Sequence, residues 1–270
     1  MGIEIPGTLG YHKLRLKGSM GSLLFSARAH RLLLHRTAVV VTFHRVDNRL
    51  KGNPIACTVD AFCRYLDFFE RHFRIVKTGD VVRGVQRGDD LSGQLAITFD
   101  DGYLDNYENA ALELESRGLP ATFFIATGMI GSETQPWWDE EYGAQATWMN
   151  WDQVRDLHAR GFEMGAHTMH HVDLGKVHGA EAKREIEGSK QRLEQELGHE
   201  VELFSYPYGR KHQITDENRE LVRAAGLKCC FSAFGGLIRN GDNPFALCRS
   251  PVTPWHVSPE HLGFELAFRS

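Results

Sequence analysis

Two neighbouring carboxylates, Asp100 and Asp101, directly follow an apolar run and precede Gly102. Such a run predicts a buried strand, so both carboxylates emerge at its carboxyl end, the functional edge of parallel α/β sheets. Side chains alternate between the two faces of a strand, but a turn that begins at Gly102 can bring both carboxylates near one site. Taken alone, these three residues are better explained as an ordinary Asp-Gly turn.

Two histidines four residues apart, His167 and His171, follow a second apolar run. This spacing puts two imidazoles on one side of a helical turn and suits a divalent cation, whereas His170 falls off that side. A histidine pair considered alone is more often a solvated surface feature. Combined with a strand-end carboxylate, it gives a two-histidine, one-carboxylate set that leaves positions open for water and substrate.

A third strand end leads into a turn fixed by Pro207 and Gly209, where backbone N–H groups could face a developing oxyanion. A loop with aromatic packing explains that segment equally well. The stretch 129–150 is rich in aromatic residues and poor in periodic pattern, which indicates an insertion after a strand. Its Trp137 and Trp138 could stack on a sugar, or they could simply pack the insertion.

From residue 38 onward, short β-branched or aromatic runs alternate with segments of helical period, the pattern of βα repeats. Glycines placed just before the next strand stop the helices. We therefore expect an α/β fold, a distorted (β/α) barrel similar to a TIM barrel, with about seven parallel strands. The expected strands are residues 38–43, 73–78, 94–99, 121–127, 162–167, 202–206 and 228–233. The clearest expected helices are residues 104–116, 151–160, 180–197 and 216–225.

No fixed repeat or low-complexity linker divides the chain, so one domain is expected over residues 38–270, after an N-terminal extension over residues 1–37. Residues 11–36 could form a basic amphipathic helix that packs on the edge of the domain or touches a membrane surface or a partner. The extension makes a poor signal peptide, because its apolar stretches are short and interrupted. The longest apolar run, residues 38–43, is far short of the roughly 20 residues that span a bilayer.

The composition of the 270-residue chain, 42% hydrophobic and 24% charged, is ordinary for a soluble globular protein. A net charge of −4 without a cluster of lysines and arginines argues against nucleic acid as a partner. The five cysteines lack the paired spacing of a zinc site. Their odd number favours reduced thiols and a cytoplasmic location, in solution or at the membrane surface.

The motifs, in this order, resemble those of the polysaccharide deacetylase family, carbohydrate esterase family four, over roughly residues 38–255. The family's first motif, TFDDG, corresponds to residues 98–102, and its second, H(S/T)xxH, to residues 167–171. Residues 43–46 and 121–124 resemble the opening of the family and its ATFF strand. So many matches in register are hard to obtain by chance.

The resemblance implies a role for each motif residue. Asp100 would be the general base. Asp101, His167 and His171 would bind one divalent metal ion, zinc or alternatively cobalt, nickel or iron, which would polarise an acetamide carbonyl and activate a water molecule. The backbone at Tyr208 would help to hold the oxyanion.

The sequence departs from the family at two places. Ser205 occupies the place of the arginine that normally pairs with the catalytic aspartate, as in the "FAYPYG" branch of exopolysaccharide deacetylases. Arg249 could supply the missing cation, or it could form a salt bridge at the rim. The histidine of the family's LxxH motif, its usual general acid, is absent from residues 247–250. His44 and His256 are candidates for this acid, and a structural role is the alternative for each.

The function implied by the resemblance is a metal-dependent hydrolase that removes N-acetyl groups from amino sugars of a polysaccharide, a glycan precursor or a lipid-linked sugar. Pro207, Trp137 and Trp138 would contact this substrate. The same metal site could instead hydrolyse another non-peptide C–N bond in a small molecule. A third hypothesis is a non-catalytic carbohydrate-binding barrel, which Ser205 and the absent histidine support.

Overall fold

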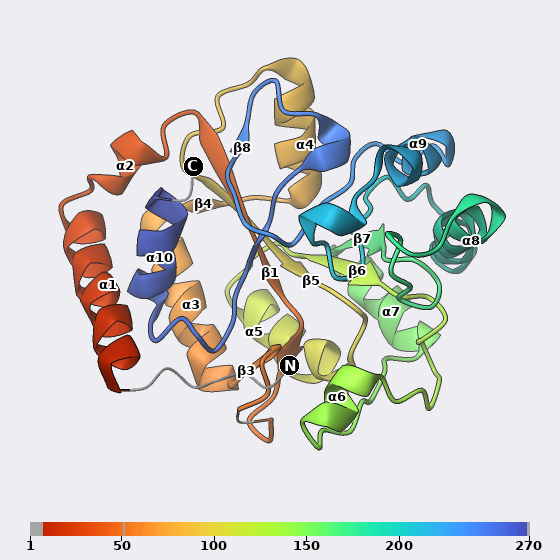
Figure 1. Cartoon of the computed structure of the whole chain (residues 1–270), viewed down its shortest axis with the longest axis horizontal. Coiled ribbons are helices and arrows are strands. Elements are labelled where there is room, and N and C mark those ends of the chain that lie inside the picture. The colour runs from red at the N-terminus through yellow and green to blue at the C-terminus, as the bar shows by residue number, and fades with distance from the viewer. Residues whose placement is uncertain (1–7, 51, 269–270) are drawn as a thin grey trace.

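A mostly parallel β-sheet forms the centre of the molecule (Figure 1). The computed structural model describes residues 8–50 and 52–268, so residues 1–7 of the predicted N-terminal extension lie outside it. The regular strands are β1 (Thr37–Phe43), β5 (Gln94–Phe99), β6 (Thr122–Ile125) and β7 (Glu163–Ala166), paired in that order. All residues of β1, β5 and β6 are buried, as expected of parallel strands covered on both faces.

Single-residue bridges continue this sheet beyond β7 and return it to β1. The bridges are parallel and lie at Ala166–Phe204, Ser205–Phe231 and Phe231–Leu247. The chain then enters β9 (Ser250–Pro251), which pairs in parallel with β1. The predicted distorted barrel is confirmed, but the strands expected over residues 202–206 and 228–233 contribute single bridges only.

Other short strands depart from a regular parallel plan. The strand expected over residues 73–78 is reduced to β4 (Arg74–Ile75), because a helix already begins at Thr78. β8 (Ile238–Arg239) runs antiparallel to β1, which corrects the expectation of parallel strands alone. A separate two-stranded sheet consists of β2 (Arg45–Val46) and β3 (Ala56–Cys57).

The helices confirm part of the predicted pattern. Three of them end within one residue of the predicted limits, namely α7 (Trp151–Ala159), α8 (Gly179–Leu197) and α9 (Asp216–Ala224). The helix expected over residues 104–116 contains a π-helical turn (Asn106–Ala110) followed by α5 (Ala111–Ser116). The remaining helices of the barrel region are α3 (Val59–His72), α4 (Thr78–Arg87), α6 (Trp137–Glu141), α10 (Pro259–Phe268) and the 3₁₀ turns Lys211–Gln213 and Pro244–Ala246.

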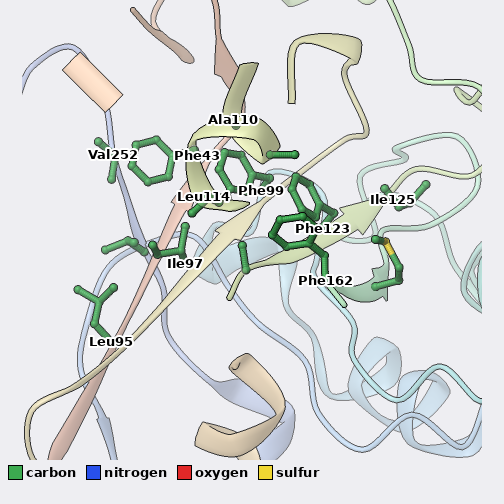
Figure 2. Close-up of a cluster of buried hydrophobic side chains, with 14 of the residues drawn as sticks. Phe43, Leu95, Ile97, Phe99, Ala110, Leu114, Phe123, Ile125, Phe162 and Val252 are labelled. Atoms are coloured by element: carbon green, nitrogen blue, oxygen red, sulfur yellow. The ribbon is translucent and has the colours of Figure 1, made fainter. Parts of the chain in front are cut away.

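A row of aromatic rings joins the ends of β1 and β5 to β6 and to the residue before β7 (Figure 2). Phe99 stacks on Phe43 with ring centroids 5.6 Å apart and on Phe123 at 4.9 Å. Phe162 meets Phe123 edge to face. Truncating one buried ring of this kind to alanine costs about 3–5 kcal/mol. The row therefore fixes the ends of β1, β5 and β6 relative to one another.

The N-terminal segment forms α1 (Thr8–Ser26) and α2 (His30–Leu33), so the single helix expected over residues 11–36 is interrupted. α1 lies at the edge of the molecule alongside α10 (Figure 1). The two backbones lie so close together that a Cβ atom at Gly21 would come within 2.0 Å of the Glu260 carbonyl oxygen. No described helix is long and apolar enough to cross a membrane, and all five cysteines have free thiols.

Candidate metal centre and active site

Three buried side chains converge at the carboxyl ends of β5 and β7. Asp101 follows β5, and both His167 and His171 follow β7. The Oδ1 atom of Asp101 lies 3.3 Å from His167 Nε2 and 3.2 Å from His171 Nε2. Among the described residues, these form the one group of three metal-ligating side chains whose ligand atoms all lie within 4.8 Å of one another. The structure thus brings together the three residues that the sequence suggests as metal ligands.

The backbone around this cluster is strained. The histidine spacing predicts a helical turn, but the residues after His167 form an irregular loop, in which Thr168 and His171 have φ angles of 62° and 53°. Asp101 (78°) and Tyr208 (59°) also have positive φ, so four of the six non-glycine described residues with positive φ lie here. Such a conformation costs an L-residue about 1–2 kcal/mol. Strain of this kind gathers where function requires it.

The protonation of His167 indicates that the cluster fits a cation. Its Nδ1 lies 2.8 Å from the carbonyl oxygen of Ser205, which can only accept, so in the neutral ring Nδ1 carries the proton. Nε2 then turns a lone pair toward Asp101, whose Oδ1 has no hydrogen-bond partner among the described residues. A lone pair and a carboxylate repel each other unless a cation lies between them. Two imidazoles and one carboxylate are a donor set that zinc and similar divalent ions accept.

The charge of the cluster is well defined. Burial alone would raise the pKa of Asp101, but the imidazoles of His171 and His167 hold that pKa well below its ordinary value. Burial lowers the pKa of His167, but the Asp100 and Asp101 carboxylates more than offset this and raise it overall. The negative potential of the two carboxylates, which raises the His167 pKa, is the electrostatic environment that a cation would occupy.

Asp100 points to a different partner from its neighbour. Both of its carboxylate oxygens accept hydrogen bonds of 2.7 Å from the guanidinium of Arg249, which is fully buried. Burial would raise the pKa of Asp100, but the Arg249 charge lowers it below the ordinary value. Asp100 is therefore held as an ionised carboxylate.

The position of Arg249 follows from the pairing of β9 with β1, which brings the end of the chain back to the start of the barrel. Its guanidinium also donates to Ser205 Oγ at 2.6 Å, to Thr98 Oγ1 at 3.0 Å and to the Ser232 carbonyl at 3.0 Å. The small Ser205 side chain leaves room for this guanidinium and accepts one of its hydrogen bonds. Arg249 is therefore a buried part of the site and not a salt bridge at its rim.

His44 and Tyr208 lie on the borders of the same site. His44 Nε2 is 4.0 Å from Asp100 Oδ2, and its half-buried side chain has a lowered pKa because desolvation outweighs the nearby carboxylates. The ring of Tyr208 lies 4.8 Å from the ring of His171, centroid to centroid. Within the described chain, the backbone N–H of Tyr208 has no acceptor. This N–H is thus available to a ligand.

Trp137 and Trp138 of the 129–150 insertion differ in position. Trp138 lies over the cluster, with its ring 4.7 Å from His171 and 5.9 Å from Tyr208. Trp137 contacts Trp138 edge to face and is 60% exposed. Pro207, by contrast, is buried in its turn, so its ring offers little surface to a substrate.

A buried polar network that sequence patterns did not indicate anchors α6 beside the cluster. Arg45 donates to Asp105 at 2.9 Å and to Asp139 at 3.0 Å, and its guanidinium lies 4.4 Å from the centroid of the Tyr103 ring. Tyr103 donates to Asp139 at 2.8 Å and accepts from Trp138 Nε1 at 2.8 Å. The network thus connects β2 to the tryptophan that covers His171. Asp139 occurs within a charged, irregular stretch, and no local pattern marks it as buried.

Two other histidines suggested by the sequence lie elsewhere. His256 is 3.5 Å from Glu265 of α10 and packs against His261. His170 pairs with Glu185 of α8 at 2.7 Å, in agreement with its expected exclusion from the ligand set. Among the histidine candidates for a general acid, His44 is the one that the structure places beside Asp100.

The sequence model of the polysaccharide deacetylase family matches residues 87–230, just over half of the chain. The chain belongs to the polysaccharide deacetylase family. The stretch that matches the family model contains Asp100 and the cluster of Asp101, His167 and His171. His44 and Arg249 lie outside it.

Two curated relatives of the deacetylase-family chain match over similar lengths. The poly-β-1,6-N-acetyl-D-glucosamine N-deacetylase of Staphylococcus aureus is 26% identical over 162 residues, which are 57% of this chain and 52% of the relative. YxkH of Bacillus subtilis is 25% identical over 158 residues, which are 58% of this chain and 51% of the relative. The chain therefore spans about half the length of the curated relatives it matches.

Solved structures share the fold of this deacetylase-family chain. The Streptococcus pyogenes deacetylase PplD superposes with a TM-score of 0.70 at 21% identity, over 84% of this chain and 96% of PplD. IcaB from Ammonifex degensii superposes with a TM-score of 0.69 at 24% identity, over 86% and 97% of the two chains. At these identities the likeness is one of fold, and it agrees with the predicted distorted barrel.

Proposed function

We propose that the protein is a metal-dependent hydrolase that removes N-acetyl groups from amino sugars of a polysaccharide or glycan precursor. The observation that carries this proposal is the arrangement of Asp100, which is ionised by Arg249, directly beside the Asp101, His167 and His171 cluster. The printed name of the Staphylococcus aureus relative, an N-deacetylase of poly-β-1,6-N-acetyl-D-glucosamine, supports this substrate class. A lipid-linked N-acetylated sugar belongs to the same class.

The metal centre would consist of Asp101, His167 and His171 around one divalent ion, for which zinc is our first choice. When bound, the ion supplies a Lewis acid for the acetamide oxygen and lowers the pKa of a water molecule. Asp100 accepts the proton of the attacking water, because Arg249 keeps its carboxylate ionised. The backbone N–H of Tyr208 donates a hydrogen bond to the oxyanion.

His44 is the proposed general acid. It lies 4.0 Å from Asp100 and is half-buried, so it borders both the base and the space above the metal centre. The lowered pKa of His44 makes its protonated ring a stronger acid, and this ring, once protonated, would transfer a proton to the leaving nitrogen as the C–N bond breaks; the products would be acetate and a free amine. Trp138, with Trp137 beside it, would provide the apolar face on which the sugar ring stacks.

The position of Arg249 also bears on the non-catalytic alternative. That hypothesis depends on the serine at position 205 and on the absent LxxH histidine. Arg249 donates hydrogen bonds to Ser205 and to Asp100, so it supplies the cation that the serine lacks. His44 borders the same carboxylate and supplies an imidazole in place of the absent histidine. This arrangement favours a working hydrolase over a binding barrel. Hydrolysis of another non-peptide C–N bond remains the alternative substrate class, and a substrate panel separates the two.

The test is acetate release from acetylated chito-oligosaccharides and poly-N-acetylglucosamine, with zinc, cobalt or nickel added after treatment with a chelator. We expect release that requires the metal. Small N-acyl compounds without a sugar serve as the comparison panel. If neither the glycans nor simple acetyl esters are hydrolysed with any of the metals, the proposed activity is wrong.

A further inference from the structure

The outer face of α1 carries an apolar stripe that packing does not explain. Leu16, Met20 and Leu23 are 62%, 48% and 72% exposed, and their spacing places them on one side of the helix. The opposite side, which includes Gly21 and Phe25, is buried. A helix that covers a domain with one face is ordinarily polar on the other. α1 lies along the edge of the molecule (Figure 1). It instead presents large apolar side chains on its outer face.

The charge around this stripe has one sign. Residues 8–36 contain six lysines and arginines and not one aspartate or glutamate. Because the whole chain has a net charge of −4 and this segment contributes six positive charges, the other residues together carry −10. The six cations are Lys13, Arg15, Lys17, Arg28, Arg31 and Arg36. Lys17 pairs with Glu265 of α10, and the exposed Lys13 and Arg15 flank the stripe.

The cationic character continues around α2. A cavity of about 460 Å³ beside this helix has a lining that includes Arg31, Arg71 and Arg74 and no carboxylate side chain. Arg31 is followed directly by Leu32, which is 82% exposed. A lipid bilayer presents acyl chains and phosphate groups side by side. Exposed leucines suit the acyl chains, and the arginines that line the neighbouring cavity suit the phosphates.

We propose that the face formed by the stripe of α1 and by α2 docks on an anionic lipid bilayer. Leucine and methionine side chains would enter the boundary between headgroups and acyl chains, and the flanking cations would contact lipid phosphates. A second copy of the chain fits less well, because two such faces would bring the cations of residues 8–36 against one another, and this segment contains no carboxylate side chain. The proposal concerns a surface separate from the metal centre and does not depend on the proposed activity.

The test is sedimentation of the full chain with vesicles of phosphatidylcholine alone or of phosphatidylcholine mixed with phosphatidylglycerol. We expect binding to the anionic vesicles that weakens as salt is added, and little binding to the neutral ones. The combined variant Leu16→Ser, Met20→Ser and Leu23→Ser should bind anionic vesicles about tenfold more weakly or worse, because the apolar surface is lost. Leu112→Ser is the matched control, since this leucine is 54% exposed on α5, and it should bind as the wild type does.

A second variant tests the charges without altering the stripe. This variant combines Lys13→Gln, Arg15→Gln and Arg31→Gln. Each cation near an anionic surface strengthens binding about fivefold, so the loss of all three should weaken partitioning onto the vesicles by about 100-fold. Circular dichroism and acetate release from a soluble oligosaccharide should be unchanged in both variants, which separates docking from folding and from the proposed activity. Wild-type protein that ignores anionic vesicles, or variants that bind them as the wild type does, would overturn the proposal. A wild-type dimer that the stripe variant converts to monomer would assign the face to self-association instead.

Discussion

The guanidinium of Arg249 binds both carboxylate oxygens of Asp100 at 2.7 Å, although 149 residues separate the two in the chain. Both side chains are buried, so neither charge has water to replace its partner. Removing one member of such a pair leaves an unpaired buried charge and costs about 3–5 kcal/mol. The pair therefore links the stability of the barrel to the ionisation of the proposed base.

The pH dependence of acetate release should respond to Arg249→Met. Asp100 acts as a base only when ionised, and the arginine lowers its pKa below the ordinary value. Without the arginine, burial, which raises the pKa of this carboxyl, is opposed only by the weaker effects of His167 and His44, so the acid limb of the kcat/KM profile should move to higher pH. Arg239→Met, at an exposed position on β8, is the control and should leave the limb in place. An unmoved acid limb in Arg249→Met would remove Arg249 from the mechanism.

Asp100→Asn should separate chemistry from metal binding. The amide keeps the shape of the side chain but cannot accept the water proton, so we expect kcat to fall by about 10²–10⁴-fold. Metal content, measured by elemental analysis, should stay at the wild-type value because the ligand set is intact. Loss of the bound metal in this variant would instead make Asp100 a ligand, and full activity would show that another group is the base.

Metal should stabilise the fold through Asp101. An ion that binds only the folded state, at 100 times its Kd, contributes about 2.7 kcal/mol, so zinc should raise the Tm of the chelator-treated wild type. Asp101→Ala should abolish this rise and Asp100→Asn should retain it. The result does not require turnover. An equal zinc-dependent rise in Asp101→Ala would place the ion elsewhere.

The parts of the fold that the sequence predicts best are those with a continuous local signal. β5 occupies residues 94–99 as expected, because a strand buried on both faces reads as an unbroken apolar run. The expected strands 202–206 and 228–233 have similar runs but are only single bridges, because pairing depends on neighbours distant in the chain. α3 is not among the clearest expected helices, although Phe62, Tyr65 and Phe69 follow a helical period.

The residues of the site also fall into those that a local sequence pattern predicts and those that it does not. Asp100, Asp101, His167 and His171 lie in short motifs at strand ends, so their grouping can be predicted once the strands are placed in one sheet. The contact between Arg45 and Asp139 spans 94 residues and has no local pattern, so the sequence did not predict it. The same is true of the positive φ angles that turn the histidines toward Asp101, where the spacing indicated a helical turn.

Trp138→Ala should weaken substrate binding more than Trp137→Ala. Trp138 lies over His171 and Tyr208, whereas Trp137 is mostly exposed beside it. An aromatic contact of this kind contributes about 0.5–1.5 kcal/mol beyond its buried area, so KM for an acetylated oligosaccharide should rise by roughly tenfold in Trp138→Ala. Equal effects of the two changes would indicate that the insertion moves as a unit.

Asp139→Ala should destabilise the protein and displace Trp138. Asp139 accepts hydrogen bonds from Arg45 and Tyr103 and is fully buried, so its removal leaves part of the Arg45 charge without a partner and costs about 3–5 kcal/mol. Glu140→Ala, at the exposed neighbouring position of α6, should stay within about 0.5 kcal/mol of the wild type. Urea unfolding measures both values. Because Trp138 donates to Tyr103, Asp139→Asn, which keeps the size of the side chain, should still raise KM. An unchanged KM in folded Asp139→Asn would confine the network to a structural role.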